Sequence, residues 1–460
     1  MGFLMTYHEI RFTGNRTGDA PLTWGQQCIW DEAKWFAPHH EHFNLKAVIE
    51  VPEGVGLPGV LGALRDFIED RESLRTTYPI DSQGVPYQHV PMGGSLSVVE
   101  ESFPAEEARS AARALTERLQ GTPFSLDEFP VRAGIITSGS SPRFLVLVIF
   151  HLAADIWDMR NIVSEMKQLL ASPDGARGTA TARDHPFDEA QRALEPRGRA
   201  VSERALKHWR AQLAHAPVDM LAGRTATPES SRFQEIYIGS EALSIAIHAL
   251  ARRLRVTPTV VFLAVASIAM GDLGGQSRAF FLLGCHNRFT ARDRMATGTV
   301  SQDSPVTVDL SGGDFRKVVQ RVWSAGLSAY SSAKWDPTAV AAAVEEAERQ
   351  RGERVDLSCN VNVDLEAGAG AAEPESPAGA EFVQELRHRT RIVKELGTSQ
   401  DRTGRRFFLR ASTYSKEIIV SLRADTTVLS SSNIVKFLKD MEELAVREYE
   451  AGRAAPAADG

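Results

Sequence analysis

One histidine of this chain stands where the surrounding sequence could hold a catalytic group. His151 follows residues 143–150 (RFLVLVIF), a nearly all-apolar run that predicts a strand buried on both faces. Asp155 comes four residues later, at the start of a segment whose apolar residues have helical spacing. A neutral imidazole in such a place can accept a proton near neutral pH, or it can orient an amine for reaction. A histidine that only completes the core at a strand end is the alternative interpretation.

The elements that must position this histidine can be predicted from periodicity. Residues 46–51 (KAVIEV) alternate like a strand, residues 57–69 have the apolar spacing of a helix, and residues 130–137 predict a further strand. A helix is expected after the histidine, and either Asp155 or Asp158 could cap it.

The later part of the chain repeats this mixture of elements. Four helices are expected at residues 243–254, 257–271, 314–328 and 430–448. Five strands are expected at residues 279–285, 304–310, 355–364, 406–411 and 417–423, of which the last two form a pair. The sum is an α/β protein made of two halves of similar size.

Length and local composition predict the domain organisation. The 460 residues are too many for one ordinary core and suit two. We expect one half over residues 1–180, a linker at 181–200, a second half over 201–450 and a disordered tail at 451–460. Residues 366–380 (EAGAGAAEPESPAGA) are of low complexity and predict a mobile loop.

Charge and cysteine content argue against several classes of protein. The net charge is 52 − 59 = −7, which disfavours non-specific binding to nucleic acid. The three cysteines form no CxxC pattern, so they predict neither a disulfide framework nor a zinc site and suit a reducing compartment. Residues 1–20 have no apolar run of signal-peptide length, and no stretch has the length of a membrane span. We therefore expect a cytoplasmic protein without a membrane partner.

No metal site is expected either. The run His39-His40-Glu41-His42 has metal-binding residue types, but neighbouring residues of one loop cannot easily converge on one ion. Nor does the sequence contain a P-loop, a GxGxxG or a GxSxG motif.

Several short motifs follow one another as they do in a known family. Residues 150–157 (FHLAADIW) resemble the signature HHxxxDG, and residues 22–30 (LTWGQQCIW) resemble the opening motif LSxxQxRLW. Residues 70–78 (DRESLRTTY) resemble RHExLRTxF, and residues 298–310 (GTVSQDSPVTVDL) resemble GxFVNTLPLRVDL. Shorter matches are Phe43-Asn44-Leu45, His208-Trp209, Asn287-Arg288 and Asp425. On this ordered set, which runs through about the whole chain, the protein resembles the condensation domains of nonribosomal peptide synthesis, as a stand-alone relative with a divergent signature.

The resemblance implies a fold and a catalytic centre. The fold would be two chloramphenicol-acetyltransferase-like halves that form a V, with a substrate tunnel between them. The second histidine of the signature, here His151, would lie in the middle of the tunnel as the catalytic residue. Asp155 would pair with Arg288 and hold the histidine loop across the two halves, as structural support. An ordinary helix-capping aspartate is the alternative for Asp155.

The resemblance also implies which residues line the tunnel: Phe150, Ile156, Trp157, Ser301, Gln302 and Ser304. Phe150 replaces the first histidine of the signature, an architectural position, and Ile156 replaces its glycine. The added bulk of Ile156 could narrow, reshape or block the tunnel. The three polar residues of this set, Ser301, Gln302 and Ser304, could donate a hydrogen bond to the substrate, or they could be solvent-facing loop residues. Besides Phe150 and Ile156, the sequence departs from the family patterns at three positions. Cys28 stands where Arg is usual, Gln302 where Asn is usual, and Thr307 where Arg is usual.

The function that the resemblance implies is amide-bond formation in natural-product biosynthesis. Such an acyltransferase would join a carrier-bound acyl or aminoacyl thioester to an amine, or form an ester with an alcohol. It would have no cofactor of its own. Its partners would be an acyl or peptidyl carrier protein, whose phosphopantetheine arm bears the substrate, and an amine-bearing small molecule or a second carrier-bound substrate.

Two other functions stay open at this point. A catalytically silent condensation-like domain that recruits a carrier protein or a tailoring enzyme is suggested by Phe150 and Ile156, and the retained His151 argues against it. An epimerase-type relative would use the same histidine together with a glutamate, for which the sequence shows no convincing match.

Overall fold

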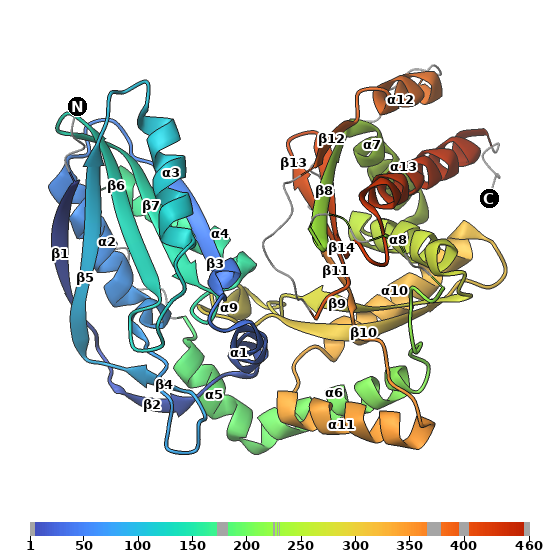
Figure 1. The fold of residues 1–460 in the computed structure, drawn as a ribbon, viewed down its shortest axis with the longest axis horizontal. Helices are drawn as coiled ribbons and strands as arrows, with labels where there is room; N and C mark the ends of the chain where they lie inside the picture. Colours follow the sequence, from blue (N-terminus) through green and yellow to red (C-terminus); the bar gives the residue numbers. More distant parts are fainter. Residues whose placement is uncertain are drawn as a thin grey trace. The chain divides into compact units, whose positions relative to one another are not determined.

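The computed structural model describes residues 5–172, 183–223, 226–227, 229, 231–365, 379–394 and 404–454 (Figure 1). The chain divides into two compact units. Unit 1 consists of Met1–Val201 and His286–Gln302, and unit 2 of Ser202–Cys285 and Asp303–Gly460. The chain therefore passes between the units at three points. The short segment His286–Gln302, which we expected within the second half, packs with unit 1.

Unit 1 is built on a five-stranded sheet with the strand order β1-β5-β6-β7-β3. Only β5 and β6 run parallel, and the other neighbours are antiparallel. The strands are β1 (Met5–Thr13), β5 (Gly93–Ser102), β6 (Val131–Ser138), β7 (Ser141–Phe150) and β3 (Asn44–Glu50). The strand that leads to His151, β7, thus lies between two partners, β6 and β3.

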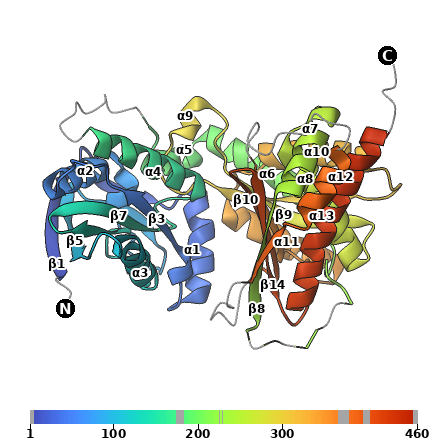
Figure 2. The same ribbon diagram turned by 90° about the horizontal axis from the view of Figure 1, so that it is seen from above.

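Helices cover both faces of this sheet (Figure 2). The helices α2 (Leu57–Asp70) and α4 (Ile156–Ala171) pack on one face, and α3 (Ala108–Gln120) packs on the other. Alternate residues of β7 enter the two cores: Leu145 and Leu147 face α2 and α4, whereas Phe144 and Val146 face α3. The all-apolar sequence of β7 is explained by this double burial, which confirms the prediction for residues 143–150.

The rest of unit 1 consists of shorter elements around the sheet. They are α1 (Trp24–Phe36), β2 (Gly18–Pro21) with its antiparallel partner β4 (Tyr87–Val90), the 3₁₀ turns η1 (Glu41–Phe43) and η2 (Glu72–Arg75), α5 (Pro186–Leu194) and α9 (Ala291–Arg294). The helix α6 (Pro196–Leu213) begins in unit 1 and ends in unit 2. The predicted linker at 181–200 therefore contains α5 and the start of α6, while residues 181–182 lie outside the described residues.

Unit 2 contains a seven-stranded mixed sheet with the order β10-β9-β11-β13-β14-β8-β12. Its strands are β10 (Gln302–Asp309), β9 (Arg278–Cys285), β11 (Cys359–Asp364), β13 (Phe407–Tyr414), β14 (Glu417–Asp425), β8 (Phe233–Ser240) and β12 (Arg391–Lys394). The third strand in this order, β11, is parallel to both β9 and β13, and from β13 to β12 all neighbours are antiparallel.

The helices of unit 2 are α7 (Glu241–Leu254), α8 (Pro258–Gly274), α10 (Phe315–Ser331), α11 (Pro337–Arg351), α12 (Gly379–Arg387) and α13 (Ser431–Ala454). The helix α8 (PTVVFLAVASIAMGDLG) is apolar nearly all round because α7, α10 and α13 contact it as well as the sheet. Among the described residues, no single helix is long and apolar enough to cross a membrane. In the same part of the chain, α7 and α8 are the one pair of helices that together reach that length and composition, and they are bent by 110°.

Most of the elements predicted from periodicity are confirmed. The differences lie at ends and in less periodic segments: the predicted strand at 355–364 begins only at Cys359, and α13 continues to Ala454, into the expected disordered tail. Residues 455–460 and 366–378, which include most of the expected mobile loop, lie outside the described residues.

Candidate active site

His151 begins a five-residue turn between β7 and α4. Its backbone N–H donates to the carbonyl of Phe43 at 3.1 Å, and the N–H of Ala153 donates to the carbonyl of Phe150 at 2.8 Å. The His151 residue is partly buried, whereas Leu152, Ala153 and Ala154 are fully buried. The turn therefore has a fixed backbone and presents one imidazole at the end of the sheet.

Asp155 closes this turn with two different bonds. One carboxylate oxygen, Oδ1, accepts the backbone N–H of Asp158 at 2.9 Å and caps α4. The other, Oδ2, lies 2.6 Å from a guanidinium nitrogen of Arg288, and the two side chains are 1% and 0% exposed. The cap and the ion pair that the sequence offered as alternatives thus occur together in one residue.

Further donors surround the same carboxylate. The hydroxyl of Ser301 donates to Asp155 Oδ2 at 2.7 Å, and the backbone N–H groups of Val300 and Ser301 donate at 3.2 Å. Burial alone would raise the pKa of the Asp155 carboxyl, but the charge of Arg288 and these hydrogen bonds hold it below its ordinary value. Asp155 is therefore an ionised support of the turn and not a proton donor.

Arg288 is placed by the segment His286–Gln302, which belongs to unit 1. Besides Asp155, its guanidinium donates to the carbonyl oxygens of Gly298 at 2.9 Å and of Ala296 at 3.4 Å. We expected the Asp155–Arg288 pair to hold the histidine loop across the two halves. Both partners instead lie in one unit, because the chain returns from unit 2 to unit 1 for these residues.

Phe150, the residue before His151, is packed in the core. It is 1% exposed, its ring stacks on Phe124 at 5.7 Å between centroids, and it contacts the ring of His40 at 5.6 Å. We expected Phe150 along the substrate tunnel. Its packing fits the architectural role that the resemblance gives to this signature position.

A family model agrees with the motifs. The model of the condensation domain matches residues 16–388. The chain belongs to the condensation domain family. Domains of this family in nonribosomal peptide and polyketide synthases generally form amide bonds between carrier-bound substrates.

The similar proteins are large synthases and synthetases, of which this condensation domain spans only a small part. It is 26% identical over 296 residues to chondramide synthase of Chondromyces crocatus, a match that covers 62% of this chain and 8% of that synthase. It is also 26% identical over 264 residues to fusarin C synthetase of Gibberella moniliformis, a match that covers 55% of this chain and 6% of that synthetase.

Solved structures show the same fold. The condensation domain that mediates chain release from the enacyloxin polyketide synthase has a TM-score of 0.74 to this chain, at 19% identity, over 97% of this chain and 85% of the other. The first condensation domain of the calcium-dependent antibiotic synthetase has a TM-score of 0.66, at 17% identity, over 93% and 96%. These likenesses confirm the predicted α/β fold with two chloramphenicol-acetyltransferase-like subdomains.

The other predicted tunnel residues of the condensation domain occupy different surroundings. Ile156, the first residue of α4, is 53% exposed, so its bulk is directed away from the core. Trp157 follows it, and its ring lies 4.8 Å from that of His286, which in turn lies 5.4 Å from the ring of Phe289. Burial and the nearby Arg288 lower the pKa of His286, so this second imidazole near the turn is neutral at neutral pH.

The three polar residues predicted for the tunnel, Ser301, Gln302 and Ser304, also differ from one another in their surroundings. Ser301 binds Asp155, as described. Gln302 is 5% exposed, and its amide donates to the sulfur of Cys28 at 3.6 Å. Two of the departures from the family patterns are thus in contact. Ser304 lies in β10 with no exposed surface, so neither Gln302 nor Ser304 is a solvent-facing loop residue.

Sequence reasoning missed the role of Gln26 in supporting the turn. The side chains of Thr23 and Gln26 form a capping box at the start of α1, and the Gln26 amide also donates to the carbonyl of Leu152 at 3.0 Å. The spacing of the capping box was visible in the motif LTWGQQCIW, but only the fold shows that the same amide reaches the residue after His151.

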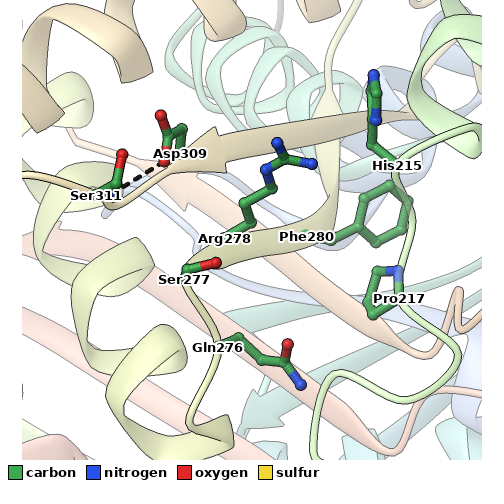
Figure 3. A pocket seen from close by; sticks show the side chains of 8 residues that line it. All are labelled: His215, Pro217, Gln276, Ser277, Arg278, Phe280, Asp309 and Ser311. Carbon is green, nitrogen blue, oxygen red and sulfur yellow. Dashed lines mark hydrogen bonds between the residues drawn. The ribbon is translucent and has the colours of Figure 1, made fainter.

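Unit 2 has a separate pocket of about 380 Å³ (Figure 3). Its lining comes from unit 2 alone: His215, Pro217, Gln276, Ser277, Arg278, Phe280, Asp309 and Ser311. No residue that the sequence predicted for the catalytic centre lines this pocket, so we do not assign it to the candidate active site.

Proposed function

We propose that this condensation domain is an acyltransferase that forms an amide between a carrier-bound acyl or aminoacyl thioester and an amine acceptor. The observation that carries the proposal is the turn after β7, where His151 is presented beside a fully buried Asp155–Arg288 pair. A buried ion pair costs desolvation, so its presence at the histidine turn is better explained by a need for fixed geometry than by stability.

The chemistry requires few protein groups. The amine nitrogen attacks the thioester carbon, a C–N bond forms, the C–S bond breaks, and the proton lost by the amine is taken up by the departing thiolate of the arm. The imidazole of His151 would either accept this proton on its way or hold the amine in line with the acyl carbon. Both roles need a neutral imidazole at a fixed place.

The supporting residues have separate tasks in this proposal. Asp155 and Arg288 hold the turn, and Ile156 and Trp157 are proposed to contact the substrate next to it. Ser301, Gln302 and Ser304 complete the predicted tunnel wall, although Ser301 already donates its hydroxyl to Asp155. The tunnel itself and the cytoplasmic location stay predictions.

The family supports a proposal for the substrates. Synthetases related to this chain carry their intermediates on the phosphopantetheine arms of carrier proteins. We therefore propose that the donor arrives on such an arm, as a substrate and not as a cofactor of this chain, and that the acceptor is a small amine or a second carrier-bound substrate. An alcohol acceptor would give an ester by the same steps.

The proposal can be tested with carrier proteins loaded with a panel of acyl and aminoacyl thioesters and a pool of amines, followed by mass spectrometry. We expect His151→Ala to lower turnover at least about a hundredfold, the usual contribution of a positioned acid–base group. His89→Ala is the matched control, because His89 is another histidine of unit 1, with a 44% exposed side chain and a hydrogen bond between its Nδ1 and the carboxylate of Asp19 at 2.6 Å.

Three outcomes are informative. Equal turnover by wild type and His151→Ala would refute the role of His151. No turnover by the wild type across the panel, together with tight binding of a carrier protein or a tailoring enzyme, would favour the recruiting domain instead. Exchange of the α-proton of a bound aminoacyl group, without amide formation, would favour the epimerase-type function.

A further inference from the structure

The loop after α9 contacts the first turn of α4, directly after the histidine turn, through a second buried carboxylate, that of Asp158. Asp158 is fully buried; its Oδ1 lies 2.7 Å from a guanidinium nitrogen of Arg71, which is also fully buried. Its Oδ2 accepts the backbone N–H of Gly298 at 2.7 Å. The charge of Arg71 thus fixes a carboxylate whose other oxygen holds the loop at Gly298.

Gly298 has a conformation and a setting that exclude other residues. Its φ is +85°, and a Cβ atom there would lie 2.4 Å from the ring of Pro186. Gly298 also forms a parallel bridge to Ala154, the residue before Asp155. The register between this loop and the histidine turn is therefore fixed at one residue.

Thr299, the next residue, reaches His151 directly. Its hydroxyl donates to the backbone carbonyl of His151, and Thr299 has no exposed surface. Its own carbonyl accepts the hydroxyl of Thr23 at 3.2 Å, and α1 approaches it so closely that a Cβ on Gly25 would lie 2.6 Å away. Thr299 is thus held by its neighbour Gly298 and by α1, with its hydroxyl directed at the histidine backbone.

We propose that Thr299 is a positioning residue for His151, and that the Arg71–Asp158 pair keeps Thr299 in place through Gly298. The proposal rests on the proposed function of His151. The carbonyl of His151 belongs to the first residue of the turn, so its orientation affects where the imidazole stands. A displacement of about 1 Å at a reacting group can cost about a hundredfold in rate, so one hydroxyl at this carbonyl can matter.

The test compares Thr299→Val, which removes the hydroxyl at nearly the same volume, with Thr299→Ser, which keeps it. Thr116→Val is the matched control, because Thr116 is a buried threonine of unit 1 whose hydroxyl donates to the carbonyl of Ala112 at 2.6 Å within α3. The measurements are kcat, KM, the melting temperature, and hydrogen–deuterium exchange of peptides that cover residues 150–158 and 296–302.

We expect Thr299→Val to lower kcat about tenfold or more while KM changes by less than about twofold. Exchange in residues 150–158 should become about fivefold faster, with Thr299→Ser close to wild type and Thr116→Val unchanged in this segment. A Thr299→Val variant with wild-type kcat and wild-type exchange in the turn overturns the proposal. The proposal is also overturned if the sole effect of Thr299→Val is a fall in melting temperature equal to that of Thr116→Val.

The exchange measurement also separates this proposal from the proposed function. If the wild type transfers no acyl group to any acceptor, the function proposed for His151 fails, but faster exchange of the turn in Thr299→Val alone still supports the positioning contact. Asp158→Asn tests the remaining step. It should speed exchange in residues 296–302 as well as in 150–158, whereas Thr299→Val should affect the histidine turn only.

Discussion

The buried ion pairs of unit 1 and the ion pairs of unit 2 differ in the solvent exposure of their arginine side chains. In unit 1, the Arg288 side chain is 0% exposed where it pairs with Asp155. In unit 2, Arg232 pairs with the buried Asp425 but is itself 50% exposed, and Arg410 at Glu235 is 43% exposed. The carboxylates of these pairs are buried in both units, and among the described residues the pairs that also bury the arginine lie in unit 1.

This difference indicates two uses of the same chemical pair. A half-exposed arginine keeps much of its hydration, so its pair contributes little stability and forms at little cost. A fully buried pair loses the hydration of both ions. The attraction between the ions offsets this desolvation cost only where the geometry is good and further hydrogen bonds are formed. Unit 1 accepts that cost for the pairs Asp155–Arg288 and Asp158–Arg71, which lie at the end of the turn that begins with His151 and in the helix that follows it.

The comparison predicts its largest effect for Arg288→Met. This change leaves the Asp155 carboxylate buried without its counter-ion, which typically costs about 3–5 kcal/mol in the free energy of unfolding. Urea denaturation followed by tryptophan fluorescence measures the loss. The double variant Arg288→Met, Asp155→Leu is the control and should recover much of it, because no charge then remains buried. A loss below about 1 kcal/mol in the single variant would contradict the distinction between the units.

Acid should weaken unit 1 through the same carboxylate. The pKa of Asp155 is lower in the folded protein than its ordinary value of 3.8, so the unfolded chain binds the proton first as the pH falls. The stabilisation is therefore present above that value and is lost as the pH drops towards the folded pKa. Urea midpoints measured at decreasing pH should fall more steeply for the wild type than for Asp155→Asn. Parallel curves would show that the carboxylate is not the titrating group.

The smallest effect is expected for Arg232→Met in unit 2. Water can replace the half-exposed guanidinium, and Asp425 keeps the hydroxyl of Thr427 at 2.6 Å and its N–H at 3.0 Å. The free energy of unfolding should fall by about 1 kcal/mol or less, and this difference should shrink in high salt. A loss as large as that of Arg288→Met would show that arginine exposure does not separate the two kinds of pair.

The parts of the site that lie close together in sequence could be predicted. A local pattern marks each of three parts: the apolar run of β7, the turn with His151 and the helix after Asp155. The ordered motifs indicated the condensation domain family. Whether Asp155 or Asp158 caps the helix could not be decided, since both stand near its first turn. The structure gives the cap to Asp155.

The contacts between distant residues could not be predicted. Asp158 is buried because Arg71 meets it, 87 residues away in the sequence, and nothing near either residue marks the pairing. Thr299 was not among the predicted tunnel residues, because a threonine next to a glycine is common in loops and indicates no particular function. Its importance depends on which carbonyl its hydroxyl meets, and that carbonyl belongs to His151, 148 positions earlier in the sequence.

The return of residues His286–Gln302 to unit 1 has a consequence for synthesis on the ribosome and for gene fusion. When residues 1–201 have been made, Asp155 still lacks Arg288, which follows it by 133 residues. Unit 1 therefore cannot complete its histidine turn before the whole first stretch of unit 2, Ser202–Cys285, has been translated. A fragment cut at residue 201 would lack that arginine, and a chimaera that exchanges the two units must carry residues 286–302 with the N-terminal part.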